Sequence, residues 1–120
     1  MMSKIIASNE QPAICPKFEF TFGILGKKWN GLIIEVLLEG ESTLRFIDLS
    51  NSIEGVSDRV LTERLKELES LGIIQRAGGP NNVRAGYCLT EKGEALHKVM
   101  NEVQEWADEW VCNEECQETK

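Results

Sequence analysis

The stretch from Val56 to Gly72, VSDRVLTERLKELESLG, restricts the fold of this chain more than any other segment. Its apolar residues recur every three or four positions, so a helix would gather them into one buried stripe made of Val60, Leu61, Leu65, Leu68 and Leu71. Ser57 can cap the start of that helix, Asp58 suits the positive end of its dipole, and Gly72 can end it in a left-handed conformation. The sequence therefore predicts an amphipathic helix with defined ends.

The segments on either side of this helix place it in a larger motif. A shorter apolar pattern in residues 46–53 precedes it, separated by the glycine-containing residues 54–56, which is typical of a helix-turn-helix. Residues 73–77 are apolar at their start, residues 78–82 are rich in chain breakers, and residues 83–89 alternate between apolar and other side chains, so they predict a hairpin. Helix, turn, helix and hairpin is the order of a winged helix, whose second helix enters the major groove of DNA.

The N-terminal half of the chain predicts two more helices. Phe18, Phe20 and Phe22 alternate as in a strand, but Phe18, Phe22 and Leu25 fit one face of a helix, and Pro16 suits a first helical position, which favours a helix. Residues 27–39 predict a core helix that ends at Gly40. Its buried face would hold Trp29, Leu32, Ile33, Val36 and Leu37. Residues 43–45 fit a short strand that would give the wing a third member.

The C-terminal part predicts one long helix capped by Thr90 and Glu91. Large apolar side chains follow one another at spacings of three, four, three and four residues: Leu96, Val99, Val103, Trp106 and Trp110. This spacing keeps one stripe facing a partner helix. A small domain would not readily cover two tryptophans on a terminal helix by itself, which indicates a homodimer. The alternative is that this helix folds back on its own core.

Length and composition fit one domain. A chain of 120 residues with 42% hydrophobic residues can build a single core. No apolar run reaches membrane-spanning length, and the first residues lack the features of a secretory signal, so we expect a cytoplasmic protein without a membrane partner. The expected organisation is a flexible arm over residues 1–14, a winged-helix domain over residues 15–111, and a fraying acidic tail over residues 112–120.

The net charge of −7 argues against nucleic-acid binding only when it is taken over the whole chain. Residues 85–120 hold three Lys or Arg against nine Asp or Glu, whereas residues 45–84 hold six of each kind. The acidic excess therefore lies outside the helix-turn-helix, whose basic residues remain available for phosphate contacts.

Several motifs together resemble the HxlR family of bacterial and archaeal transcription regulators, relatives of the MarR winged helices. The matching segments are Cys15-Pro16, Leu25-Gly26-Lys27-Lys28-Trp29, Leu44-Arg45-Phe46 with Leu49, VSDRVLTERLKELE over residues 56–69, and YCLTEKG over residues 87–93. The resemblance implies a mainly helical α+β fold, a winged helix-turn-helix with a two- or three-stranded wing and dimerisation through N- and C-terminal helices. It also implies sequence-specific binding of double-stranded DNA by a homodimer. The expected dimer interface comprises Phe18, Phe22, Leu96, Val99, Val103, Trp106 and Trp110.

The candidate DNA contacts lie on the outward face of the long helix and around it. Arg59 and Thr62, near its start, can reach base edges, and Ser57 can cap the helix or contact a phosphate. Lys66 lies a turn deeper and suits a phosphate, whereas Arg64 lies near the apolar stripe and suits a structural ion pair. Further candidates for backbone or minor-groove contact are Arg45, Arg76, Asn81, Asn82 and Arg84. The alternative for Arg59 and Thr62 is an ordinary solvated helix face, and for the wing residues it is plain loop solubility. For Arg64 the alternative is a contact to DNA.

The four cysteines should be reduced thiols in a cytosolic protein. Cys88 fits a small buried hydrophobe in the hairpin, and Cys112 and Cys116 with the single His97 do not make a zinc site. Cys15 precedes Pro16 at the expected start of a helix, where the dipole and Lys17 favour a nucleophilic thiolate. Some members of the family that this chain resembles sense oxidants or electrophiles with a cysteine at this position. The alternative is a cysteine that only packs near the dimer axis.

These observations favour a dimeric DNA-binding transcription regulator that responds to an oxidant, an electrophile or a small-molecule ligand and needs no cofactor. The competing hypothesis is a winged helix used as a protein-interaction module, which an acidic surface would suit. An enzyme built on Cys15 is disfavoured, because the chain offers only His97 as a base and places it in the C-terminal helix.

Overall fold

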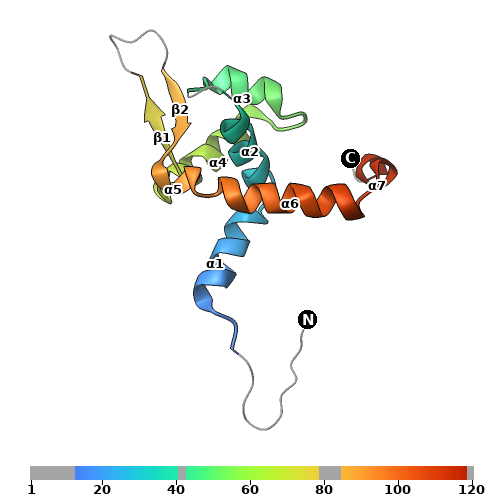
Figure 1. The fold of residues 1–120 in the computed structure, drawn as a ribbon. Helices are drawn as coiled ribbons and strands as arrows, with labels where there is room; N and C mark the ends of the chain where they lie inside the picture. The colour runs from blue at the N-terminus through green and yellow to red at the C-terminus, as the bar shows by residue number, and fades with distance from the viewer. Residues whose placement is uncertain (1–12, 41–42, 79–84, 119–120) are drawn as a thin grey trace.

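The computed structural model describes residues 13–40, 43–78 and 85–118. Figure 1 shows a small hairpin at one side of a group of helices, with the N-terminal helix and the C-terminal helices extending from this body in different directions. In chain order the elements are α1 (Pro16–Leu25), α2 (Asn30–Glu39), α3 (Phe46–Ser52), α4 (Asp58–Ser70), β1 (Ile74–Ala77), β2 (Gly86–Leu89), α5 (Glu91–Glu94), α6 (His97–Trp110) and α7 (Asn113–Glu118).

The hydrophobic core lies where α2, α3 and α4 meet the base of the hairpin. Its buried side chains are all aliphatic: Ile33, Ile34, Leu37, Leu49, Ile53, Leu61, Leu65, Leu68, Ile73, Ile74 and Leu89. Every element of the predicted helix-turn-helix and hairpin contributes at least one of them. The winged helix-turn-helix expected from the sequence is therefore the fold of the described residues.

Helix α4 has the ends that its sequence predicts. The Ser57 side chain accepts a hydrogen bond from the Val60 amide at 3.2 Å, which satisfies one of the free donors of the first turn. Beyond the last turn Gly72 has a φ of +78°, a conformation that costs glycine little. The interior of the apolar stripe is buried, whereas Val60 and Leu71 at its ends are only partly covered.

The wing has two antiparallel strands, in which Ile74 lies opposite Leu89 and Ala77 opposite Gly86. The predicted third strand over residues 43–45 is reduced to an isolated bridge, in which Leu44 and Tyr87 exchange both backbone hydrogen bonds. A Cβ atom on Gly86 would overlap the Leu44 carbonyl, so a glycine is needed there. The tip of the wing, including the candidates Asn81, Asn82 and Arg84, lies outside the described residues.

Two predictions about the N-terminal half were wrong in detail. Helix α2 begins at Asn30 instead of Lys27, because Trp29 has a φ of 82° and breaks the helical path between α1 and α2. Its buried face includes Ile34, and Leu32, which we expected in the core, is exposed. A helix that contacts neighbours on several sides does not follow the single-stripe pattern of a surface helix. The segment with the ambiguous phenylalanines is a helix, α1, with Pro16 at its first position.

The long C-terminal helix predicted from Thr90 is interrupted. Thr90 caps the short α5, the chain turns at Ala95 and Leu96, and α6 begins at His97. The Leu96 amide donates to the Gly93 carbonyl, a tighter turn than an α-helix makes. The expected fraying of residues 112–120 was also wrong for most of that segment, because α7 covers Asn113–Glu118. None of the described helices combines the length and apolarity that crossing a bilayer requires.

Candidate nucleic-acid interface

The first turns of α4 present polar side chains to the outside of the molecule. Arg59 is 87% exposed, and its Nε lies 3.7 Å from the Glu63 carboxylate one turn later. Thr62 is also exposed, but its hydroxyl donates to the Asp58 carbonyl at 2.8 Å. The hydroxyl hydrogen is therefore used inside the helix, which leaves the methyl group and an oxygen lone pair of Thr62 for an outside contact. Ser57 is exposed as well and caps the same end.

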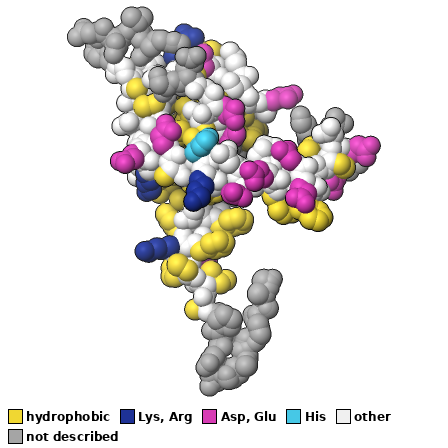
Figure 2. All heavy atoms as spheres, viewed as in Figure 1, with side chains coloured by type: hydrophobic (Ala, Val, Ile, Leu, Met, Phe, Trp, Pro, Cys, Tyr) yellow, Lys and Arg dark blue, Asp and Glu magenta, His cyan; other side chains and the backbone are white. Residues whose placement is uncertain are grey.

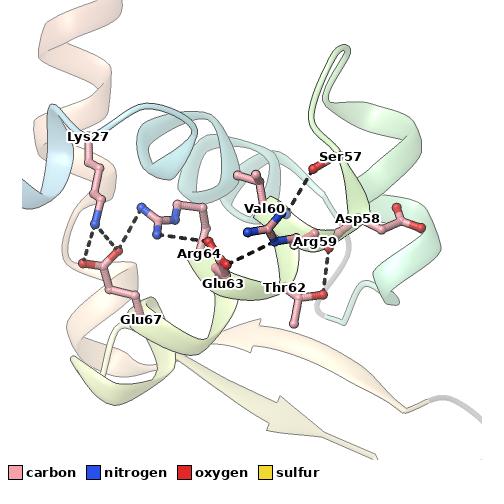
Figure 3. A network of polar contacts seen from close by, with 9 residues as sticks. All are labelled: Lys27, Ser57, Asp58, Arg59, Val60, Thr62, Glu63, Arg64 and Glu67. Atoms are coloured by element: carbon pink, nitrogen blue, oxygen red, sulfur yellow. Dashed lines mark hydrogen bonds and ion pairs between the residues drawn. The ribbon is translucent and has the colours of Figure 1, made fainter.

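Two basic residues in the second half of α4, Arg64 and Lys66, have different surroundings. The Arg64 side chain is only 15% exposed and lies 3.5 Å from Glu67 and 4.0 Å from Glu63, as its predicted structural role requires. Figure 3 shows these contacts along the helix. Lys66 is exposed and therefore remains accessible to a phosphate.

The two flanking arginines that the structure describes also have partners within the protein. Arg45 precedes α3, where its guanidinium lies 3.2 Å from Asp48 and its amide donates to the same carboxylate. Arg76 on β1 lies 3.7 Å from Glu69 and 5.3 Å from the ring centre of Tyr87. Both side chains are more than half exposed, so either guanidinium could exchange its partner for a phosphate.

A second exposed surface is apolar and belongs to the two helices that leave the body. Phe18 and Phe22 on α1 stack with ring centres 5.8 Å apart and are both exposed. On α6 the exposed apolar side chains are Val99, Val103, Trp106 and Trp110. Figure 2 shows apolar side chains gathered on α1 and along one edge of α6. Leu96, which we assigned to the same surface, packs partly against the core of its own chain.

A cavity of about 800 Å³ lies between α1, α2 and α6. Aromatic and aliphatic side chains line most of it, including the two phenylalanines of α1, Trp29 and Leu32. Two charged residues, Lys27 and Glu35, also lie in its wall. Burial raises the pKa of Glu35 above its ordinary value, and a hydrogen bond and repulsion from Glu39 raise it further, while His97 acts in the opposite direction.

The cysteines occupy different environments. Cys15 is the N-cap residue of α1, as the sequence predicts, and it is exposed in the protomer. Cys88 on β2 is partly buried, and Cys112 and Cys116 near α7 are exposed. Within the residues that the structure describes, no three His, Cys, Asp or Glu side chains converge where they could hold a metal ion.

Sequence reasoning missed the corner between α1 and α2. The Asn30 side chain is completely buried and donates to the Ile24 carbonyl at 3.0 Å, which ties the end of α1 to the start of α2. Lys27, in the turn between these helices, lies 3.4 Å from Glu67 of α4. An asparagine next to the apolar run that begins at Leu32 was the available signal for the first contact. The second joins residues 40 positions apart, which no periodic pattern reveals.

Comparison with known proteins places this fold in a family. The model of the HxlR-like helix-turn-helix matches residues 24–115, which is most of the described chain. The chain belongs to this family. Its relatives carry the names of transcriptional regulators and not of enzymes. One of them, YodB of Bacillus subtilis (strain 168), is 47% identical over 109 residues, which cover 85% of this chain and 96% of YodB.

Two solved structures of HxlR-type or related regulators add information about effectors. The quinone-bound structure of YodB superposes with a TM-score of 0.69 at 46% identity, covering 81% of this chain and 100% of that one. The redox regulator HypR in its reduced form superposes with a TM-score of 0.68 at 29% identity, covering 87% of this chain and 99% of that one. The chain is therefore similar to one regulator that was solved with a quinone bound and to another that is described as a redox regulator.

Proposed function

We propose that this protein is a dimeric, sequence-specific DNA-binding transcription regulator that responds to oxidants or electrophiles through Cys15. The observation that carries the proposal is the exposed N-terminal end of α4, where Arg59 and Thr62 extend from a capped helix in a winged helix-turn-helix. In such folds this end of the second helix contacts base edges in the major groove. Arg59 would read a base, and the methyl group of Thr62 would contact a thymine methyl.

The remaining DNA contacts would position the domain on the backbone. Ser57 and Lys66 on α4, Arg45 before α3, and Arg76 with Asn81, Asn82 and Arg84 in the wing are proposed to contact phosphates or the minor groove. Arg45 and Arg76 would exchange their exposed carboxylate partners for phosphates, a small cost because exposed ion pairs contribute little. These contacts would fix the register of α4 without reading sequence themselves.

Dimerisation would cover the apolar surface of α1 and α6. Trp106 and Trp110 are 62% and 65% exposed in one protomer, which is much apolar area to leave in water. We propose an interface made of Phe18, Phe22, Val99, Val103, Trp106 and Trp110, with Leu96 at its edge. A two-fold axis would then place two α4 helices about one turn of DNA apart, so the operator would be a palindrome.

The response to an effector is proposed from the position of Cys15 and from the relatives. The thiol is exposed at the first turn of α1, next to the proposed interface, so an adduct or a disulfide there would alter how the protomers meet. A relative of this chain has been solved with a quinone bound, and another is described as a redox regulator. The cavity beside α1 offers a second route, the binding of a small apolar molecule.

Selection of bound fragments from random DNA by the purified protein tests the proposal. The reduced protein should enrich a palindromic site, and its affinity should fall steeply with salt because phosphate contacts release counterions. A protein-interaction module would enrich no site. Its binding to a protein partner would depend less on salt. Repeating the selection after treatment with a quinone tests the response in the same assay.

Replacing Arg59 with alanine is expected to cost about 1–3 kcal/mol of operator binding and to relax specificity at one base position, because a base contact is lost. Replacing Lys66 with alanine, the matched change for a phosphate contact, should weaken binding to all sequences and lower the salt slope by about one. Gel-shift titrations against the selected site and its single-base variants distinguish the two effects. An Arg59 variant with unchanged affinity would remove this residue from base recognition.

Replacing Cys15 with serine is expected to remove the response of DNA binding to diamide or a quinone and to leave the affinity of the untreated protein unchanged. Serine keeps the size and polarity at the start of α1 but is not oxidised under these conditions. The matched control is Cys112→Ser, which removes another exposed thiol. Equal responses of wild type and the Cys15 variant would exclude Cys15 from the mechanism.

A further inference from the structure

A continuous row of ion pairs runs from the turn between α1 and α2 to the reading end of α4. Lys27 Nζ lies 3.4 Å from the Glu67 carboxylate, and Glu67 lies 3.5 Å from Arg64. Arg64 lies 4.0 Å from Glu63, and Glu63 lies 3.7 Å from Arg59. Figure 3 shows the five side chains in this order along one side of α4. Positive and negative side chains alternate along the row, so moving or removing the charge at one end changes the electrostatic potential at the next side chain.

The middle of the row is partly sheltered from water, although Lys27 at its inner end is 46% exposed. The side chain of Arg64 is 15% exposed and that of Glu67 is 32% exposed, whereas Arg59 at the outer end is almost fully solvated. Ion pairs at a partly buried site are screened less than those on the surface, and a network couples more strongly than an isolated pair. Glu67 contacts both Lys27 and Arg64, so it joins the two segments of the chain.

The junction also contains two buried polar atoms without a hydrogen-bond partner, Arg64 Nε on α4 and Asn30 Oδ1 on α2. They are the two such side-chain atoms found among the described residues. Buried donors and acceptors are normally paired, and one left unpaired is costly. Neither atom is therefore held in place by a hydrogen bond within the described residues.

The contacts at the corner between α1 and α2 link the orientation of α1 to the position of Lys27. Helix α1 extends from the body, as Figure 1 shows, and carries Cys15 at its far end. Its near end is fixed to α2 by the hydrogen bond from Asn30 to the Ile24 carbonyl and by the left-handed turn at Trp29. The backbone amide of Asn30 also donates to the Lys27 carbonyl. A tilt of α1 would therefore displace Lys27 along with the corner.

We propose that Glu67 is a positioning residue for DNA recognition, which couples the orientation of α1 through Lys27 and Arg64 to the side chain of Arg59. The inference rests on the proposed function, because Arg59 is taken there as the base-reading residue. When α1 moves, Lys27 pulls Glu67 away from Arg64 or releases it. Arg64 then competes differently with Arg59 for Glu63, so the guanidinium of Arg59 is held or freed.

A double-mutant cycle between Lys27→Met and Glu67→Gln tests this coupling, with Glu69→Gln as the matched control. Glu69 lies on the same helix and pairs with Arg76, outside the row. Each variant is first checked for native helix content and thermal unfolding. Two quantities are then measured: the affinity for the selected operator, and the NMR signal of the Arg64 Nε–H group in the free protein.

Each single variant of the row is expected to change operator affinity about three- to tenfold, and the double variant no more than one of them alone, because both remove the same link. The Arg64 signal should shift in Lys27→Met but should show no further shift when this change is made in the Glu67→Gln protein. Glu69→Gln should leave the Arg64 signal unchanged. Two results would overturn the inference: a change in affinity in the double variant that equals the product of the two single changes, or an Arg64 signal that Lys27→Met does not shift.

The same data separate this inference from the proposed function. If the wild-type protein selects no DNA site, the proposed function fails, and the Arg64 signal alone decides on the coupling. A shift in Lys27→Met that disappears in the Glu67→Gln background then supports a link between the corner and α4. A signal that is the same in all variants overturns it.

Discussion

Replacing Trp106 with glutamate is expected to give a folded monomer that binds the operator at least about 100-fold more weakly than the wild type. The indole is exposed in one protomer and lies on the apolar stripe of α6, so its loss should not disturb the core of the domain. A carboxylate in the middle of a dimer interface would have to be buried without a partner. Each monomer would then hold its half-site alone and lose the advantage of a tethered second contact.

Sedimentation velocity and gel-shift titration of the same sample check both parts of this prediction. Asn101→Glu is the matched control, because it adds the same charge to α6 about 140° round the helix from Trp106. It should leave the dimer intact. A Trp106→Glu protein that sediments as a dimer would place the interface elsewhere.

Replacing Gly93 with alanine is expected to lower the free energy of unfolding by about 3 kcal/mol. Gly93 is buried in α5, and a Cβ atom there would overlap the carbonyl oxygen of Ile73. That carbonyl accepts hydrogen bonds from both the amide and the side chain of Thr90. The methyl group could be accommodated only by moving α5 away from the start of β1, which would break the connection between the wing and α6.

Urea unfolding followed by circular dichroism measures this cost. The control is Glu94→Ala at the next position, which is exposed and should change stability by no more than about 0.5 kcal/mol. Similar midpoints for the two variants would mean that α5 can shift without loss, and that the contact with Ile73 contributes little.

The sequence predicted those parts of the fold whose signals are local. The cap at Ser57, the left-handed Gly72 and the apolar stripe of α4 lie within one short stretch, and the structure confirms all three. The breaks at Trp29 and at Ala95 were not predictable in this way. Tryptophan and alanine are ordinary helix residues, and the chain turns there because the helices on either side pack in different directions.

The residues of the candidate site fall into the same two groups, those predicted from local signals and those that depend on packing between distant segments. The exposure of Arg59 and the ion pairing of Arg64 follow from their positions round one helix, and both agree with the structure. The bond between Lys27 and Glu67 depends on how α4 packs against a distant turn, so no spacing within the sequence indicates it. All the DNA contacts, on α4 as well as in the wing, and the residues of the dimer interface stay predictions.

The cap of α4 has a practical consequence for engineering. Because the Ser57 side chain caps the start of this helix and the core packs against its opposite face, Arg59 and Thr62 are exposed, and the contacts that they make lie within α4 itself. Arg59 and Thr62 can therefore be randomised together in a library whose members keep the same scaffold. Under the proposed function, selection from such a library would yield variants that bind new operator sequences.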